Sequence, residues 1–298
     1  MTSQTNMIPK VALLQPPGRA RKKPTYLRRF GAHIIVSGLG LLMLYPLIWM
    51  LSSSLKPTEA IFSEPGLIPE NFTLDNYVQG WNALGLDFGI FVANSAVIAV
   101  LSVVGNLVSC SLAAYAFARL EFRYKKVMFG AMLATLMLPF HVVLVPQYIL
   151  FHSAGMTDTF FPLIIPKFLA VDAFFIFLMV QFIRGLPKEL DDAATVDGCS
   201  AAGVFWRIIL PLMRPALAVT AVFTFIWTWN DFLTPLLYLT DQELFTVPLA
   251  LNAFLDSGGA SAWGPLFAMS ILSVLPILVI FIISQKHLTE GIATSGLK

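Results

Sequence analysis

The chain has 298 residues, of which 57% are hydrophobic and 12% are charged, with a net charge of +2, whereas soluble domains are roughly 45–50% apolar and about 25% charged. Its mean hydropathy is +0.77. This composition excludes disorder, a nucleic-acid-binding arm and almost any soluble enzyme, because so much apolar surface could not be hidden from water. Cys110 and Cys199 have no pair spacing and no adjacent histidine, so neither a disulfide framework nor a zinc cluster is expected. We therefore expect a multi-span protein of the lipid bilayer that binds no nucleic acid.

Residues 1–30 contain many basic side chains and several prolines, and we expect them to form a disordered basic tail. This tail and the apolar run after it resemble a secretory signal peptide. The uncharged run is too long for the hydrophobic region of such a peptide, however, and no small-residue cleavage site follows it. We therefore predict that the apolar run is retained as the first membrane span.

Six charge-poor runs are each long enough to cross about 30 Å of hydrocarbon as a helix of about 20 residues. We predict an all-α integral membrane domain over 31–298. Its spans are 32–52, 88–115, 127–147, 160–183, 215–238 and 263–285. Asp172 in the fourth span and Asp231 in the fifth are residues to test, because ionisable groups at membrane depth are functional candidates by default. More often, however, such a side chain is hydrogen-bonded within the helix bundle and has only a structural role.

Basic residues are concentrated in alternate segments between the predicted spans. Seventeen of the 19 Lys and Arg residues lie in the N-terminal tail, in the loops after spans two and four, or in the C-terminal tail. The loops on the opposite side hold acidic residues instead. Because short basic segments stay in the cytoplasm, we expect both termini to be cytoplasmic.

The sequence contains none of the short motifs of common catalytic sites. It has no GxxxxGK[ST] loop, no HExxH, no GxSxG and no CxxC. Asp191 and Asp192 are adjacent carboxylates, but their loop shows no apolar pocket that would separate their pKa values. We therefore expect no catalysis, metal or cofactor in this chain.

The loop between spans four and five, 187–211, has the pattern of two short helices. Pro187 suits the first position of a helix with acidic first turns, and Gly198 suits its left-handed end. Ser200 can cap a second short helix, which Pro211 and Pro215 should confine before span five begins. Such an amphipathic helix–turn–helix on the cytoplasmic surface is suited to docking in a groove of a partner.

The spacing of this loop resembles the signature of binding-protein-dependent ABC importer permeases, which is Glu-Ala-Ala, three residues, Gly, nine residues and Ile-x-Leu-Pro. The matching residues are Asp192, Ala193, Ala194, Gly198, Leu210 and Pro211. Asp192 replaces the family's glutamate, which keeps the charge and shortens the side chain by one methylene. Less specific matches to the carbohydrate (maltose and multiple-sugar), maltose-G-like branch occur at 53–57, 76–77, 94–95, 114–119 and 229–236.

The resemblance implies an ABC importer type I (MetI-like) permease fold with a cytoplasmic coupling helix–turn–helix, in the inner membrane of a bacterium. It implies that the chain forms half of a pore with a second permease subunit. Two copies of a cytoplasmic ABC ATPase, which uses ATP and Mg, and an extracytoplasmic solute-binding lipoprotein would complete the importer. Asp192 would accept a hydrogen bond or ion pair from an ATPase arginine, and the loop would move with the ATPases as a rigid element.

Two further segments are candidates for contact with other molecules. The residues concerned are Trp229, Asn230 and Asp231 in span five, and Asp256, Ser257, Gly258 and Gly259 before span six. The first three either line the permeation path or pack between helices. The last four belong to the loop 252–260, which takes the position of the family's loop that reaches the binding protein, although an ordinary glycine-rich connector would look the same.

The resemblance favours a sugar or oligosaccharide as the solute, and glycerol-3-phosphate or a related polyol is an alternative within the same branch. In the maltose member of the family the sugar is held mainly by the other permease subunit, so no substrate ligand is assigned here. A different class, an ion-coupled secondary carrier, would use Asp172 and Asp231 as a proton relay. The inverted repeats typical of such carriers are not seen.

Overall fold

The computed structural model describes residues 26–257 and 263–295. It contains two units, Met1–Ile48 and Trp49–Lys298. Within the described ranges the regular elements are all helices, so the predicted all-α class is confirmed there. The tail predicted over 1–30 lies outside the described residues except for 26–30, which are helical.

Helix α1 (Tyr26–Ser54) contains the first predicted span. Its stretch His33–Ser54 has a mean hydropathy of 2.2, and every side chain over 33–48 is exposed. A helix that is apolar on all sides needs an apolar environment around it. This part of α1 therefore requires lipid or another protein around it.

The second unit holds the remaining helices. They are α2 (Asp75–Asn82), α3 (Phe88–Arg119), α4 (Lys125–Thr135), α5 (Phe140–Ser153), α6 (Phe161–Phe168), α7 (Ala173–Arg184), α8 (Glu189–Val196), α9 (Ala201–Val204), α10 (Leu210–Leu212), α11 (Arg214–Trp229), α12 (Leu233–Tyr238), α13 (Val247–Ser257) and α14 (Trp263–Ser295). Short 3-10 turns η1 (Thr58–Ala60) and η3 (Gln242–Leu244) and a π-helical turn η2 (Phe205–Ile209) lie between them.

Among the described residues, four stretches are long and apolar enough to cross a membrane, and two bent pairs of helices raise the number to six if each pair is one span. The four are His33–Ser54, Phe88–Arg119, Phe161–Arg184 and Trp263–Gln285. The bent pairs are α4 with α5, at 101°, and Ala201–Leu212 with α11, at 74°. The predicted third span, 127–147, is thus not one straight helix. Pro139 precedes α5 directly and has no N–H with which to continue the hydrogen bonds of α4.

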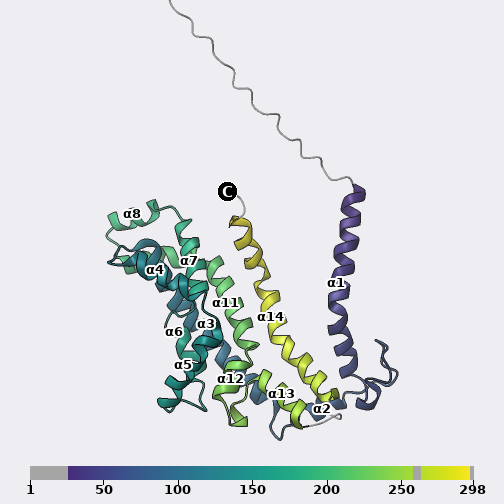
Figure 1. Ribbon diagram of the computed structural model, residues 1–298. Coiled ribbons are helices and arrows are strands. Elements are labelled where there is room, and N and C mark those ends of the chain that lie inside the picture. Colours follow the sequence, from purple (N-terminus) through teal and green to yellow (C-terminus); the bar gives the residue numbers. More distant parts are fainter. Residues whose placement is uncertain (1–25, 258–262, 296–298) are drawn as a thin grey trace, which may run out of the picture. The chain divides into compact units, whose positions relative to one another are not determined.

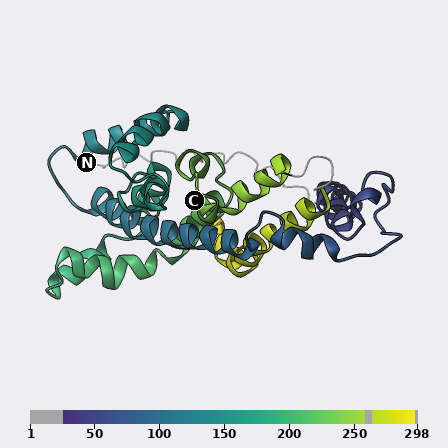
Figure 2. The ribbon, with the colours of Figure 1, turned by 90° about the horizontal axis from the view of Figure 1, so that it is seen from below.

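Helix α3 runs through the second unit (Figures 1 and 2) and belongs to all three of its packed clusters. Phe91 packs with residues of α13 and α14, and Ile98 packs with residues of α5, α6 and α12. Near its C-terminal end, Ala114 and Tyr115 pack with α7 and with the segment that follows α8. In Figure 1, α4 and α8 lie at one end of this unit and α2, α12 and α13 lie at the other. One helix therefore contacts both ends of the unit.

At the α2 end, buried polar side chains fix the loop that follows α1. Lys56 is fully buried, and its Nζ donates to the carbonyls of Glu64 (2.5 Å) and Gly66 (2.6 Å). Asn76 donates to the carbonyl of Lys56 at 2.7 Å. A Cβ on Gly264 would overlap Asn76 Oδ1, so glycine allows α14 to begin directly against α2.

Candidate functional site

The segment 187–211, here called the coupling hairpin, contains two short helices joined at a glycine. Helix α8 begins at Glu189, so Pro187 lies just before the helix and not at its first position. Gly198 follows the helix with φ +82°, and the Cys199 N–H donates to the Ala194 carbonyl at 2.9 Å. This is the left-handed helix end that the glycine predicted. Ser200 caps α9, because its hydroxyl accepts the Gly203 N–H at 3.2 Å.

The second arm of the coupling hairpin passes through Pro211 and ends one residue after it, before Pro215. Helix α9 passes into the π-helical turn η2 and then into α10, which contains Pro211 and ends at Leu212. Proline has no N–H to donate to the carbonyl four residues before it. A wider turn with i→i+5 hydrogen bonds lets the helix continue through such a residue. The chain then bends by 74° into α11.

The C-terminal end of α3 contacts both arms of the coupling hairpin. Arg119 Nε lies 2.6 Å from Asp191 Oδ2, and Arg119 Nη2 donates to the Leu186 carbonyl at 2.9 Å. The Tyr115 hydroxyl donates to the Ala201 carbonyl at 3.0 Å. The two side chains of the ion pair are only 6% and 19% exposed, so screening by solvent is reduced.

This contact is not evident from the sequence, in which Asp191 is one of several acidic residues in the first turns of a helix and a carboxylate adjacent to Asp192. The available signal was Arg119, which closes the branch motif at 114–119. A basic residue at the end of one helix can pair with an acidic residue in the first turn of another helix, because their charges are opposite.

The two faces of α8 have different surroundings. Ala194 is buried, in one cluster with Val204, Phe205 and Met179. Asp192 and Ala193 are exposed. Two residues of the predicted motif therefore have different environments, since Ala194 packs on the helix bundle whereas the Asp192 carboxylate faces outward. The Asp192 carboxylate accepts no hydrogen bond from the described residues.

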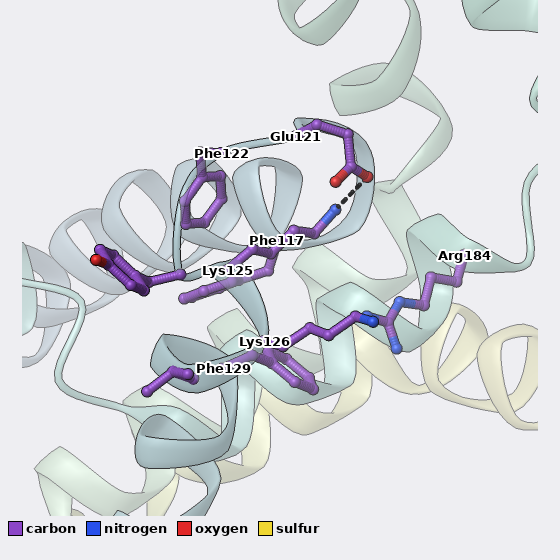
Figure 3. Close-up of a pocket in the computed structure, with 9 residues that line it drawn as sticks. Phe117, Glu121, Phe122, Lys125, Lys126, Phe129 and Arg184 are labelled. Carbon is purple, nitrogen blue, oxygen red and sulfur yellow. Dashed lines mark hydrogen bonds and ion pairs between the residues drawn. The ribbon is translucent and has the colours of Figure 1, made fainter.

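A hollow of about 520 Å³ lies between the end of α3, the start of α4 and the end of α7 (Figure 3). Its lining combines basic and aromatic side chains, which are Lys125, Lys126, Arg184, Phe117, Phe122, Tyr124 and Phe129, with Glu121 and Val127. Glu121 and Lys125 form an ion pair of 3.0 Å. The Arg184 guanidinium lies over the Phe129 ring, 5.1 Å from its centroid. This lining suits an anionic group such as a phosphate or carboxylate.

Trp229, Asn230 and Asp231 lie where α11 ends and have different environments. Trp229 is buried, stacks on Phe225 at 5.4 Å and donates its indole N–H to the Ser273 carbonyl at 3.1 Å. It therefore packs α11 against α14. Asn230 is exposed and donates to a carbonyl of its own helix, whereas Asp231 is half-buried and accepts the backbone N–H of Thr234 at 3.1 Å.

The segment predicted to meet a binding protein is only partly described. Asp256 and Ser257 form the last residues of α13, so the expected loop begins later than predicted. Gly258 and Gly259 lie outside the described residues. No group of three or more His, Cys, Asp or Glu side chains within the described ranges could hold a metal ion.

Comparison with known proteins identifies the family of this chain. Residues 105–294 match the family described as binding-protein-dependent transport system inner membrane component. This is more than half of the chain, and the chain belongs to that family, the ABC importer permeases. The resemblance seen in the coupling hairpin is thereby confirmed.

Individual relatives cover most of the chain. The arabinooligosaccharides transport system permease protein AraQ of Halalkalibacterium halodurans is 35% identical, with 85% of this chain and 91% of the relative covered. The trehalose/maltose transport system permease protein MalG of Thermococcus litoralis is 32% identical, with 87% and 93% covered. A crystal structure of a bacterial ABC transporter that imports the acidic polysaccharide alginate has a chain with the same fold. Its TM-score is 0.77 at 22% identity, with 89% of this chain and 99% of that chain covered.

Proposed function

We propose that this chain is the permease subunit of an ATP-driven importer for a sugar or oligosaccharide, and that it forms half of the translocation pore. Family membership supports the importer class. The sugar is supported by two relatives, the arabinooligosaccharide permease AraQ and the trehalose/maltose permease MalG, since this chain covers nearly the whole length of each. The observation that carries the proposal is the coupling hairpin, whose motif carboxylate faces outward while its opposite face is packed on the bundle.

The proposed topology has six spans, with each bent pair of helices counted as one, and both termini in the cytoplasm of a bacterium. The basic residues support this orientation, because they lie in alternate segments along the chain. The coupling hairpin and the basic hollow of Figure 3 would then lie on the cytoplasmic side.

The proposed coupling mechanism needs partners that supply the energy. Two ATPase subunits, which bind ATP and Mg, would contact the hairpins of this chain and of a second permease subunit. Asp192 would accept a charge-assisted hydrogen bond from an ATPase arginine. When the ATPases close, α8 would move, and Arg119 and Tyr115 would transmit that movement to α3. A solute-binding lipoprotein would deliver the sugar at the opposite end.

Substitution in the hairpin tests this proposal in vesicles that contain the complete importer. Asp192→Lys and Gly198→Pro should abolish uptake of labelled maltose and arabinotriose, while the protein stays inserted. Glu189→Lys is the matched control, because it makes the same charge change in the first turn of α8 outside the motif. Wild-type uptake by both motif variants, or uptake that needs no ATP and stops with an uncoupler, would contradict the proposal.

We also propose roles for the other two predicted segments. Asn230 and Asp231 are candidates for the permeation path because they lie at the break between α11 and α12 and are not fully buried, whereas Trp229 packs on α14. Asp256, Ser257, Gly258 and Gly259 are candidates for contact with the binding protein. Deletion of 257–260 should reduce stimulation of ATP hydrolysis by that protein, and unchanged stimulation would remove this role.

A further inference from the structure

The predicted fourth span is broken in its middle, and the break holds an ion pair. Helix α6 ends at Phe168 and α7 begins at Ala173, and Ala170 between them has φ +55°. Lys167 Nζ lies 2.9 Å from Asp172 Oδ2. Asp172 is the twelfth residue of the 24-residue apolar stretch Phe161–Arg184, so the pair lies near the centre of the proposed span.

Buried polar side chains of α3 and α11 fix this ion pair. Asn106, which is fully buried, donates to Asp172 Oδ2 at 2.6 Å and to Thr224 Oγ1 at 3.0 Å. The Ser109 hydroxyl donates to the Lys167 carbonyl at 2.7 Å, which satisfies a carbonyl that the helix break leaves without an intrahelical partner. The backbone on both sides of the break is therefore held by α3.

The ion pair keeps hydrogen-bonding capacity that no described residue uses. Asp172 Oδ1 accepts no hydrogen bond within the described ranges, and the three-donor ammonium of Lys167 has Asp172 as its one acceptor there. The two side chains are 28% and 26% exposed. Free donors and acceptors at the centre of a membrane are costly in hydrocarbon, so this face requires water or a polar ligand.

Aromatic side chains follow the polar residues closely along the chain in α7 and α11. Trp227, one helical turn after Thr224 on α11, is 52% exposed, and Phe174 is 45% exposed. The two ring centroids are 5.9 Å apart, and Phe175 supports Trp227 from the buried side at 5.2 Å. Trp227 is thus held in position by neighbouring rings while about half of it remains exposed.

We propose that Lys167, Asp172 and Trp227 form a contact site for one ring of a neutral saccharide during its passage, an inference that rests on the proposed sugar import. A sugar hydroxyl can donate to Asp172 Oδ1 while its neighbour accepts from Lys167 Nζ. The apolar face of the ring would stack on Trp227. Because the charges of Lys167 and Asp172 cancel, the site favours a neutral sugar over an acidic one.

Thiol labelling tests whether this face is open to water. Lys167→Cys is introduced with Cys199→Ser, since Cys199 is partly exposed and Cys110 is buried. In vesicles with the assembled importer, a charged methanethiosulfonate reagent should modify Cys at 167, and saturating maltose or arabinotriose with the binding protein should slow the modification severalfold. Leu39→Cys is the control that should stay unmodified, because α1 is apolar on all sides at this position and needs an apolar environment, from which a charged reagent is excluded. Absence of modification at 167 would overturn the proposal.

Uptake kinetics give a second readout that separates this site from the importer assignment. Asp172→Asn and Trp227→Leu should each raise the half-saturating concentration about tenfold, as expected for loss of one charged hydrogen bond or one stacking contact. Phe161→Leu, an exposed aromatic at the start of α6, is the control. If Asp192→Lys abolishes uptake but the half-saturating sugar concentration is unchanged in Asp172→Asn and Trp227→Leu, the proposed importer function is supported and the proposed sugar site is refuted. If the wild-type importer moves neither sugar, the proposed function itself fails.

Discussion

At the scale of single residues, Gly198 determines how the two arms of the coupling hairpin meet. Its φ of +82° lies in a region where a Cβ costs about 1–2 kcal/mol. Gly203, five residues later, lies in α9, and a Cβ there would be in ordinary contact at 3.6 Å. The two glycines therefore form a matched pair for substitution.

We expect Gly198→Ala to destabilise the hairpin by about 1–2 kcal/mol and Gly203→Ala to leave it unchanged or slightly more stable. Limited proteolysis between α8 and α9 in the assembled importer measures the difference. Equal cleavage rates for the two variants would show that the left-handed conformation at Gly198 is not needed.

Asp158 provides a pH-dependent contact between the loop after α5 and the loop after α12. Its carboxylate accepts hydrogen bonds from Thr240 Oγ1 (2.7 Å), Thr240 N (2.6 Å) and Asp241 N (3.0 Å). These hydrogen bonds hold the pKa of Asp158 below its ordinary value of 3.8. Since the lowered pKa favours the ionised form in the folded protein, the contact is present above pH 3.8 and is lost as the pH falls through the lowered pKa.

We expect the amides of Thr240 and Asp241 to be protected from hydrogen exchange at neutral pH and to lose this protection only in strong acid. Asp158→Ala removes the acceptor and should abolish protection at every pH. Asp158→Asn keeps an acceptor that does not titrate, so its protection should not depend on pH. Loss of wild-type protection between pH 5 and 7 would contradict this account.

At the scale of elements, Arg119 joins α3 to the coupling hairpin. Arg119→Gln removes the charge opposite Asp191, whose Oδ1 is buried without a hydrogen-bond partner in the described structure. Leaving such a partly buried carboxylate unpaired costs about 1–3 kcal/mol. We expect several times less sugar transported per ATP hydrolysed, with the protein still inserted.

The control for this prediction is Arg123→Gln. Arg123 lies in the next loop, with its guanidinium over the Tyr124 ring at 4.8 Å, and it makes no ion pair within the described residues. The ratio of uptake to ATP hydrolysis in vesicles is the measurement. An Arg119→Gln importer with the wild-type ratio would show that α3 does not receive movement from the hairpin.

At the scale of the whole molecule, the alternation of basic and acidic segments predicts the topology. Alkaline phosphatase fused after Arg123, in the loop between α3 and α4, should be inactive because the enzyme folds only outside the cytoplasm. A fusion after Asp241, between α12 and α13, should be active. The reverse pattern would place the coupling hairpin outside the cell and would refute the proposed mechanism.

Much of the fold could be predicted because it depends on local properties of the chain. The start of α3 at Phe88 and of α14 at Trp263 coincide with the predicted spans, since long apolar runs specify a helix in lipid without help from neighbours. The cap at Ser200 and the left-handed Gly198 are also local, because they involve backbone groups only a few residues away.

Other features depend on contacts between segments far apart in sequence, and these could not be predicted. The bend between α4 and α5 and the break at 169–172 fall inside runs that look continuous by composition. A broken span is stable only where another helix satisfies the freed polar groups, as Asn106 and Ser109 of α3 do here.

The amino-acid sequence by itself therefore determined the membrane class, the all-helical character and the family. Apolar run length and motif spacing are local properties, which can be found along the chain without knowledge of its packing. The tertiary structure alone decided that Arg119 pairs with Asp191, that Trp229 packs on α14, and that Lys167 and Asp172 lie together in a helix break. The physical reason is that a polar side chain in a membrane protein is placed by the partner that satisfies it. That partner is chosen by how helices pack, which the order of residues along one helix does not specify.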